Sequence, residues 1–206
     1  MLERFRQFWS NFWAPVGDLL LRLGVKPDWV TIVGTVGVTA AALWFFPRGQ
    51  FFLGVLVIVV FVFSDIIDGY MARKSGQSSK WGAFLDSTLD RVADAAIFAG
   101  LVLWYAGEGD STLYLSLSLA CLVFGALTSY TRARAESLGM TAKGGIAERA
   151  DRLVAILVMT GLAGLLNLPI LIEIVLWALA AASAVTVLQR MIMVHKQAMG
   201  PDHHNM

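Results

Sequence analysis

Long apolar stretches alternate with short polar breaks along most of the chain. Six segments reach the roughly 20 residues that a helix needs to cross a bilayer, and they comprise residues 27–46, 51–72, 82–106, 113–137, 148–168 and 170–194. Pro47, Gly49, Gly107, Gly109 and Pro169 punctuate these segments, and short loops of this kind join antiparallel helices. The pattern predicts an all-α integral membrane protein in which six transmembrane helices form three hairpins.

The N-terminal segment has a different pattern, with aromatic and aliphatic residues at steps of three and four. Phe5, Phe8, Trp9 and Phe12 begin this series, and arginine, asparagine and aspartate lie mostly between its members. Such spacing predicts an amphipathic helix in the membrane interface, with a surface helix packed on other helices as the alternative. We therefore expect an amphipathic juxtamembrane helix at 1–24, one six-span domain at 25–196 and a polar tail at 197–206.

The composition supports a membrane protein. Of the 206 residues, 57% are hydrophobic and 15% are charged, and the mean hydropathy is +0.67. The net charge of +1 indicates neither a nucleic acid nor an acidic partner. A single cysteine, Cys121, excludes a disulfide within the chain and a zinc site built from cysteines.

Basic residues are distributed unevenly over the six expected helices. Arg48 is the one residue among the 16 lysines and arginines that falls on one side of this topology, and the others fall on the opposite side. By the positive-inside rule the side rich in basic residues is cytoplasmic. We expect a multi-pass protein of the cell membrane, with its polar chemistry on the cytoplasmic side.

Five aspartates interrupt the apolar pattern at that side. Asp65 and Asp68 are three residues apart near the end of the second segment, and Asp86, Asp90 and Asp94 are four apart near the start of the third. Both spacings place side chains on one face of a helix. Because a loop of about nine residues joins the two segments, we expect the two carboxylate rows to face each other at similar depth.

Carboxylates crowded in this way repel one another unless a cation lies among them. Oxygen ligands without nearby histidine or cysteine favour Mg²⁺, with Mn²⁺ as a substitute. Four carboxylates suffice for two ions about 4 Å apart, an arrangement suited to displacement at phosphorus. Asp65 and Asp86 are the candidates to bridge the ions, and the alternative for these aspartates is ion pairing with Arg73, Arg91 and nearby lysines.

Small residues accompany the aspartates on the same helices. Gly69 and Ala72 follow Asp68, and Gly82 begins the next segment. Small side chains let a substrate or a neighbouring helix approach the backbone, and close helix packing is the alternative explanation for the glycines.

The residues and their spacing together form a motif. Asp65, Asp68, Gly69, Ala72, Arg73, Gly82, Asp86 and Asp90 follow the pattern D-x2-D-G-x2-A-R-x8-G-x3-D-x3-D. This pattern reproduces the signature of the CDP-alcohol phosphotransferases, and the six-span layout extends the resemblance over most of the chain. The resemblance implies transfer of a substituted phosphate from a CDP-linked donor to an alcohol, with release of CMP.

The resemblance also implies roles for the motif residues. Asp65, Asp68 and Asp86 would be metal ligands, and Asp90 would be a further ligand and the base that takes the proton from the acceptor hydroxyl. These roles agree with the chemistry, since metal ions stabilise the departing CMP and a carboxylate activates a poor nucleophile. The family resemblance further suggests a homodimer.

Donor-binding residues are expected at the start of the first segment and in the loop between the aspartate helices. The run KPDWVTIVG is similar to the family's P-N-x-x-T, with Asp28 where asparagine is common, so Asp28 and Thr31 would hold the cytidine. Arg73 and the hydroxyl of Ser78 or Ser79 would meet the diphosphate of CDP-diacylglycerol. Helix capping by Pro27 and Asp28 and a solvated loop are the alternatives for these residues.

Acceptor-binding residues are expected among the remaining arginines. Arg134, Arg152 and Arg190 would bind a phosphate-bearing acceptor, because guanidinium groups match phosphate geometry, whereas orientation by the positive-inside rule is the alternative. The runs RARAESLG and KGGIAERADR resemble an actinobacterial branch of the family that joins CDP-diacylglycerol to inositol 1-phosphate. Glycerol 3-phosphate remains open as the acceptor.

A membrane carrier for cations is the rival class, since intramembrane aspartates also mark transport pathways. All five aspartates cluster at the cytoplasmic end and the outer half of the segments is apolar, which disfavours a path across the membrane. Asp94 lies outside the motif, and we expect it to support Arg91 or a neighbouring helix.

Overall fold

The computed structural model describes residues 13–76 and 79–199, with the exception of the side chain of Asp65. The described residues are almost entirely helical and contain no strand, which confirms the all-α prediction. After a helix at 13–22 the elements are α2 (Pro27–Phe45), the 3₁₀ turn η1 (Phe46–Arg48), α3 (Phe51–Val62), α4 (Ser64–Ser75), α5 (Lys80–Ala106), α6 (Thr112–Ser137), α7 (Arg149–Leu166) and α8 (Ile170–Ala198).

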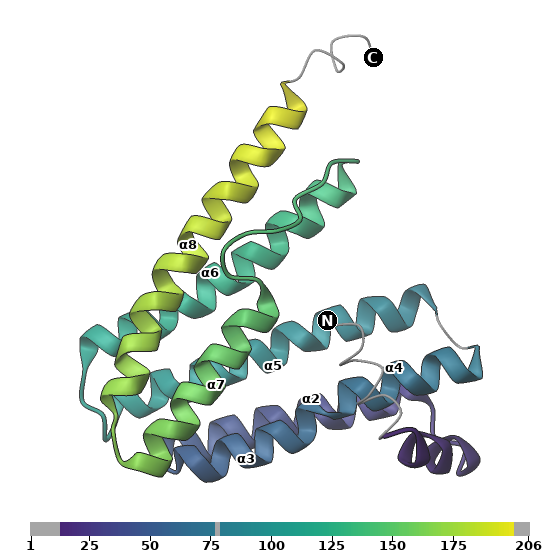
Figure 1. Ribbon diagram of the computed structural model, residues 1–206, viewed down its shortest axis with the longest axis horizontal. Coiled ribbons are helices and arrows are strands. Elements are labelled where there is room, and N and C mark those ends of the chain that lie inside the picture. Colours follow the sequence, from purple (N-terminus) through teal and green to yellow (C-terminus); the bar gives the residue numbers. More distant parts are fainter. Residues whose placement is uncertain (1–12, 77–78, 200–206) are drawn as a thin grey trace.

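The long helices pack as a closed ring (Figure 1). The three expected hairpins are present, because α2 packs against α3, α5 against α6, and α7 against α8. Contacts of α2 with α5, α3 with α7, and α6 with α8 close the ring. Phe46, Leu101, Ile156 and Leu176 are fully buried and come from four different parts of this ring. One shared core therefore holds the hairpins together.

Four helical stretches in the described part of the chain are long and apolar enough to cross a membrane: Pro27–Arg48, Phe51–Ser75, Thr112–Ser137 and Ile170–Ala198. Charged residues set α5 and α7 apart from these four. Asp90, Arg91 and Asp94 lie near the middle of α5, and Arg149, Asp151 and Arg152 begin α7. Several apolar helices indicate a multi-pass membrane protein, and crossing by all six segments stays a prediction.

The second apolar segment differs from the expectation of one continuous helix. Helix α3 ends at Val62 and α4 begins at Ser64, with Phe63 between them. Gly34 of α2 lies directly beneath this junction, where an added Cβ atom would clash with the Ser64 side chain, and a Cβ at Gly37 would clash with the ring of Phe61. The break thus lies where α2 packs closely on this segment, a contact that the local pattern does not encode.

The helix at 13–22 packs on α4. Asp18 accepts hydrogen bonds from Lys74 Nζ at 2.6 Å and from the Tyr70 hydroxyl at 2.9 Å, and Gly17 lies close to Tyr70 and Met71. Residues 13–22 are helical, and the aromatic residues from Phe5 to Phe12 lie outside the described residues, so an amphipathic helix over 1–24 stays a prediction. Its position in a membrane interface stays a prediction.

Candidate active site

The N-terminal half of α2 connects the two aspartate-bearing helices. Both α4 and α5 pack against α2, whereas direct contact between α4 and α5 is marginal. Thr31 of α2 bonds to Asp68 of α4, and Asp28 of α2 lies close to Gly82 of α5. The first segment therefore serves as the common support for both halves of the motif.

Asp68 is buried, with 7% of its surface exposed. The hydroxyl of Thr31 lies 2.5 Å from its Oδ2 atom, a short distance typical of a hydrogen bond to a charged acceptor. The same hydroxyl lies 3.3 Å from the carbonyl oxygen of Pro27, one turn earlier. Thr31 thus fixes the orientation of a carboxylate that the apolar core would otherwise exclude.

Asp90 lies deeper along α5 than Asp86 and is paired with arginines. Arg149 Nη2 lies 2.8 Å from Asp90 Oδ1, and Arg91 Nη2 lies 3.5 Å from Asp90 Oδ2. Asp94 accepts hydrogen bonds from Arg149 Nε and forms an ion pair with Arg91. The prediction that Asp94 supports Arg91 or a neighbouring helix is therefore confirmed for both. Asp86, by contrast, is exposed.

Arg149 was not singled out by the sequence analysis. It is the first residue of α7, where the positive end of the helix dipole disfavours a cation. A basic residue at that position is a usable signal, because it indicates a carboxylate partner elsewhere in the fold. Asp90 and Asp94 are those partners.

The two motif glycines have free space beside them. A Cβ atom at Gly82 would come no nearer than 3.4 Å to Ser79 Oγ and 3.8 Å to Asp28 Oδ1, which are ordinary contacts. At Gly69 the nearest group would be the guanidinium of Arg73, at 3.3 Å, and this side chain is flexible. Packing within the described chain therefore does not explain either glycine, and the alternative of close helix packing loses support.

The remaining donor candidates lie on α4, at the start of α5 and in the first turn of α2. Ser79 is the N-cap of α5, and its hydroxyl oxygen accepts a hydrogen bond from the backbone N–H of Gly82 at 2.9 Å. Arg73 is exposed near the end of α4, and Ala72 lies beside it. The N-cap of α2 is Lys26 and receives no hydrogen bond through its side chain, so Asp28 lies within the first turn rather than at the cap. Ser78 lies outside the described residues.

The donor set fits a hard divalent cation. Asp68, Asp86 and Asp90 offer carboxylate oxygens, and Asp68 and Asp90 are largely shielded from solvent. Among the described side chains no three acidic, histidine or cysteine residues come together as ligands for one ion, and the side chain of Asp65 is outside that set.

The three acceptor candidates differ in their surroundings. Arg152 and Arg190 are buried, with 2% and 4% of their surface exposed. Arg152 donates to the carbonyl oxygens of Ala147 and Gly125, and Arg190 donates to those of Gly144 and Thr128. Arg134 is exposed near the end of α6 and lies 3.3 Å from the hydroxyl of Ser137. The structure thus buries two of these arginines and leaves the third at the surface.

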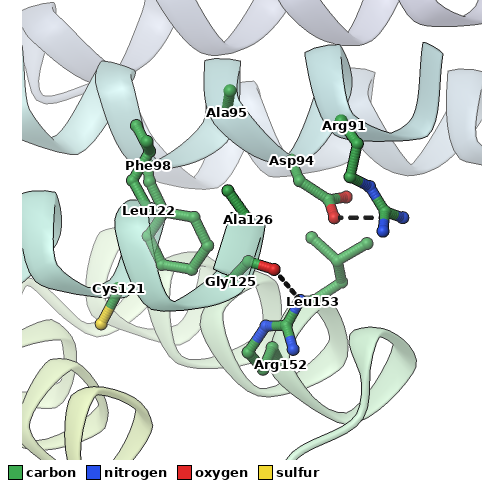
Figure 2. A pocket seen from close by; sticks show the side chains of 10 residues that line it. All are labelled: Arg91, Asp94, Ala95, Phe98, Cys121, Leu122, Gly125, Ala126, Arg152 and Leu153. Atoms are coloured by element: carbon green, nitrogen blue, oxygen red, sulfur yellow. Dashed lines mark hydrogen bonds and ion pairs between the residues drawn. The ribbon is translucent and has the colours of Figure 1, made fainter. Parts of the chain in front are cut away.

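A small cavity lies between α5, α6 and α7, directly beside Asp94 (Figure 2). Arg91 and Asp94 border it from α5, Arg152 from α7, and the side chains of Phe98 and Leu122 form an apolar wall. Its volume of about 40 Å³ is enough for a few water molecules and too small for a sugar phosphate. The cavity therefore lies between the aspartate helix and the buried Arg152, and most of its lining is apolar.

Known proteins share this sequence pattern and this fold. A family model described as CDP-alcohol phosphatidyltransferase matches residues 25–149, which include the whole aspartate motif. The chain belongs to the CDP-alcohol phosphatidyltransferase family.

Individual relatives cover nearly the whole chain. A phosphatidylinositol phosphate synthase of Streptomyces avermitilis is 50% identical over 98% of this chain and 86% of its own length. One from Cutibacterium acnes is also 50% identical, over 95% of this chain and 98% of its own length.

Solved structures resemble the fold as a whole. The crystal structure of Mycobacterium tuberculosis phosphatidylinositol phosphate synthase (PgsA1) with CDP-DAG bound has a TM-score of 0.86 and 38% identity, and the match covers 93% of this chain and 96% of that one. The same enzyme in complex with manganese and citrate also has a TM-score of 0.86 and 38% identity, over 93% of this chain and 91% of that one.

Proposed function

We propose that this chain transfers the phosphatidyl group from CDP-diacylglycerol to inositol 1-phosphate, giving phosphatidylinositol phosphate and CMP. Relatives of that name at 50% identity over nearly the full chain support the substrate pair. The observation that carries the proposal is the position of Asp90, which lies within ion-pair distance of Arg149 while Arg152 borders the adjacent cavity. A proton acceptor and phosphate-binding side chains are thereby held together.

One set of residues binds the donor, CDP-diacylglycerol. Asp28, Thr31 and Ser79 bind and orient the cytidine and diphosphate, and the space beside Gly69 and Gly82 admits the donor close to the backbone. Ala72 keeps the same face of α4 small, and Arg73 meets the diphosphate charge from the end of that helix. The donor is thus held along the supporting helix α2.

The acceptor is activated at Asp90. A hydroxyl of inositol 1-phosphate gives its proton to the Asp90 carboxylate while its oxygen bonds to the phosphorus of the phosphatidyl group. The bond from that phosphorus to the CMP oxygen breaks, and CMP leaves with the bonding electrons. Arg134, Arg152 and Arg190 hold the acceptor phosphate and orient the attacking hydroxyl.

Asp65, Asp68, Asp86 and Asp90 would hold two divalent ions, Mg²⁺ with Mn²⁺ as a substitute. A complex of a relative with manganese supports a metal cofactor of this kind. When bound, such ions neutralise the diphosphate and stabilise the charge on departing CMP. The enzyme is further proposed to act in the cell membrane with its site on the cytoplasmic side, as a homodimer of six-span subunits.

The test is metal-dependent release of CMP from CDP-diacylglycerol in detergent micelles. Inositol 1-phosphate, glycerol 3-phosphate and inositol are supplied side by side, and release is expected with the first alone. Asp90→Asn should abolish release, and Asp110→Asn, which makes the same change at an exposed residue in the loop between α5 and α6, should leave it unchanged. Release with glycerol 3-phosphate alone would identify that compound as the acceptor. If no alcohol gave release, the proposed enzymatic activity would be wrong.

A further inference from the structure

The carboxylate of Asp94 lies among three arginines from two helices. Arg149 Nε donates to both of its oxygens, at 3.1 and 3.2 Å, and Arg91 Nη2 lies 3.7 Å away. Arg152 borders the same cavity as Asp94 (Figure 2). The Asp94 side chain is 15% exposed, so its charge is shielded from water and depends on these partners.

Arg149 joins Asp94 to Asp90 through separate nitrogen atoms. Its Nη2 atom lies 2.8 Å from Asp90 Oδ1, while its Nε atom bonds to Asp94. The two aspartates are one turn apart on α5, so one guanidinium spans a single turn of that helix. Two carboxylates fix this guanidinium, whereas Asp90 alone would leave it able to rotate.

This bridge links α5 directly to α7. Helix α7 packs on α3 and α8, and α5 packs on α2 and α6, while the backbones of α5 and α7 scarcely approach each other. Arg149 is the first residue of α7 and Arg152 lies three residues later, on the same face. Holding Arg149 therefore also determines where Arg152 lies relative to the aspartate helix.

The charges around this link favour an anion. Arg91, Arg149 and Arg152 carry three positive charges, and Asp90 and Asp94 carry two negative ones. Without Asp94 the guanidinium of Arg149 would keep Asp90, the proposed proton acceptor, as its remaining carboxylate partner in this bridge. Asp94 thus shares the guanidinium of Arg149 with Asp90 and weakens the ion pair between Arg149 and Asp90.

We propose that Asp94 is a positioning residue, which acts through Arg149 to set the first turn of α7, and with it Arg152, in register with Asp90 for a phosphate-bearing acceptor. This inference rests on the proposed function, because it requires that the acceptor phosphate bind beside α7. It assigns to a residue outside the aspartate motif a role in acceptor recognition.

Asp94→Asn is the main test, because asparagine keeps the size and one oxygen while removing the charge. The KM for inositol 1-phosphate is expected to rise about tenfold, as for the loss of a charged hydrogen bond. The KM for CDP-diacylglycerol should stay the same. Asp94→Glu keeps the charge and should show a much smaller rise, again in the acceptor KM alone, and Asp110→Asn should change neither constant.

A second variant tests whether Asp94 acts through Arg149. Arg149→Gln should raise the acceptor KM by itself, and adding Asp94→Asn to it should cause no further rise, because the partner is already gone. The inference would be overturned if the acceptor KM of the double variant rose by the product of the two single-variant factors. It would also be overturned if Asp94→Asn changed the KM for the donor and the KM for the acceptor equally. Should Asp94→Asn fail to purify as a single folded species, Asp94→Glu decides by the same comparison of the two KM values.

Failure of the proposed function has a different signature. Wild-type protein that releases no CMP with inositol 1-phosphate contradicts the proposed acceptor, and the Asp94 variants are then compared with glycerol 3-phosphate. Wild-type activity with inositol 1-phosphate and an unchanged acceptor KM in Asp94→Asn would leave the proposed function intact and remove the role of Asp94.

Discussion

The hydroxyl of Thr31 lies 2.5 Å from Asp68 Oδ2, across the contact between α2 and α4. The two residues are 37 positions apart, and both are buried. This bond ties the supporting helix to the first half of the aspartate motif. Several properties of the protein should depend on it and on the contacts around it.

Replacing Thr31 by valine should weaken the protein measurably. The shape of the side chain is kept, but the buried Asp68 loses a donor, at a cost of about 1.5–3 kcal/mol for a hydrogen bond to a charged group. The thermal unfolding midpoint in detergent should fall and the Mg²⁺ concentration for half-maximal CMP release should rise. Thr31→Ser, which retains the hydroxyl, should restore both.

The matched control is Thr39→Val on the same helix. The Thr39 hydroxyl oxygen is buried without a hydrogen-bond partner among the described residues, so its removal should be neutral or slightly stabilising. Equal losses in the Thr31 and Thr39 variants would show that the bond to Asp68 has no special role.

Alanine at Gly69 or Gly82 should impair binding of the donor without impairing the fold. The added Cβ atom meets ordinary contacts at Gly82 and a movable arginine at Gly69, so thermal stability should be retained. The KM for CDP-diacylglycerol should rise about tenfold, the order expected when one methyl group intrudes on a packed contact.

Gly34→Ala should behave in the opposite way. An added Cβ atom there would clash with the Ser64 hydroxyl and lie 2.9 Å from the Ser64 Cβ atom, which cannot rotate away, so α2 and the α3–α4 junction must separate. A lower unfolding midpoint is expected in this variant. Stable Gly82→Ala protein with an unchanged donor KM would contradict the use of that space by the donor.

Arg190→Lys should raise the KM for the acceptor selectively. The guanidinium donates to the Gly144 carbonyl oxygen at 3.0 Å and to that of Thr128 at 2.6 Å, and a lysine ammonium does not reproduce this fork. A rise of about tenfold in the acceptor KM is expected, with the donor KM unchanged. Arg132→Lys, at an exposed arginine paired with Glu136, is the control and should be silent. Parallel rises in both KM values would reduce Arg190 to a structural role.

The contact of the helix at 13–22 with α4 should depend on pH only in strong acid. Hydrogen bonds from Lys74 and then from Tyr70 hold the pKa of Asp18 below its ordinary value of 3.8. A lowered folded-state pKa means that the contact stabilises the protein above the ordinary pKa and loses this effect as pH falls through the folded value. The hydrogen-exchange protection factors of residues 13–22, which are corrected for the intrinsic pH dependence of exchange, should therefore stay constant from neutral pH to about pH 5 and decrease only below the ordinary aspartate range. Asp18→Asn should remove this pH dependence.

The positions of the helices followed closely from the sequence. Pro47, Gly107 and Pro169 interrupt the helical pattern, and the helices end or begin within a few residues of them. Helix-breaking residues act locally, so they are visible in one sequence. The three hairpins followed from the short loops for the same reason.

The break at Phe63 was missed because no proline or glycine marks it. It depends on Gly34 and Gly37, which lie on another helix and become relevant only when α2 packs against α3 and α4. Such a tertiary contact leaves no periodic signal in the segment that it divides.

The candidate site was predicted in its residues more than in its arrangement. Spacing placed Asp90 and Asp94 on one face, and the ion pairs with Arg149 agree with that face. The support by α2 and the bridge from α7 join residues far apart in the chain, and no local pattern reports them. Like charges on α4 and α5 gain nothing by approaching each other without a counter-ion.

Helix α8 has 29 residues and is therefore roughly 43 Å long at 1.5 Å per residue, while the hydrocarbon layer is about 30 Å thick. Near its far end Gln197 bonds to the backbone N–H and carbonyl of Thr141, and so fastens the segment that precedes α7. In the proposed reaction, the part of α8 that exceeds this thickness would reach the aqueous phase, from which a water-soluble sugar phosphate would come, whereas the lipid donor would come from the leaflet.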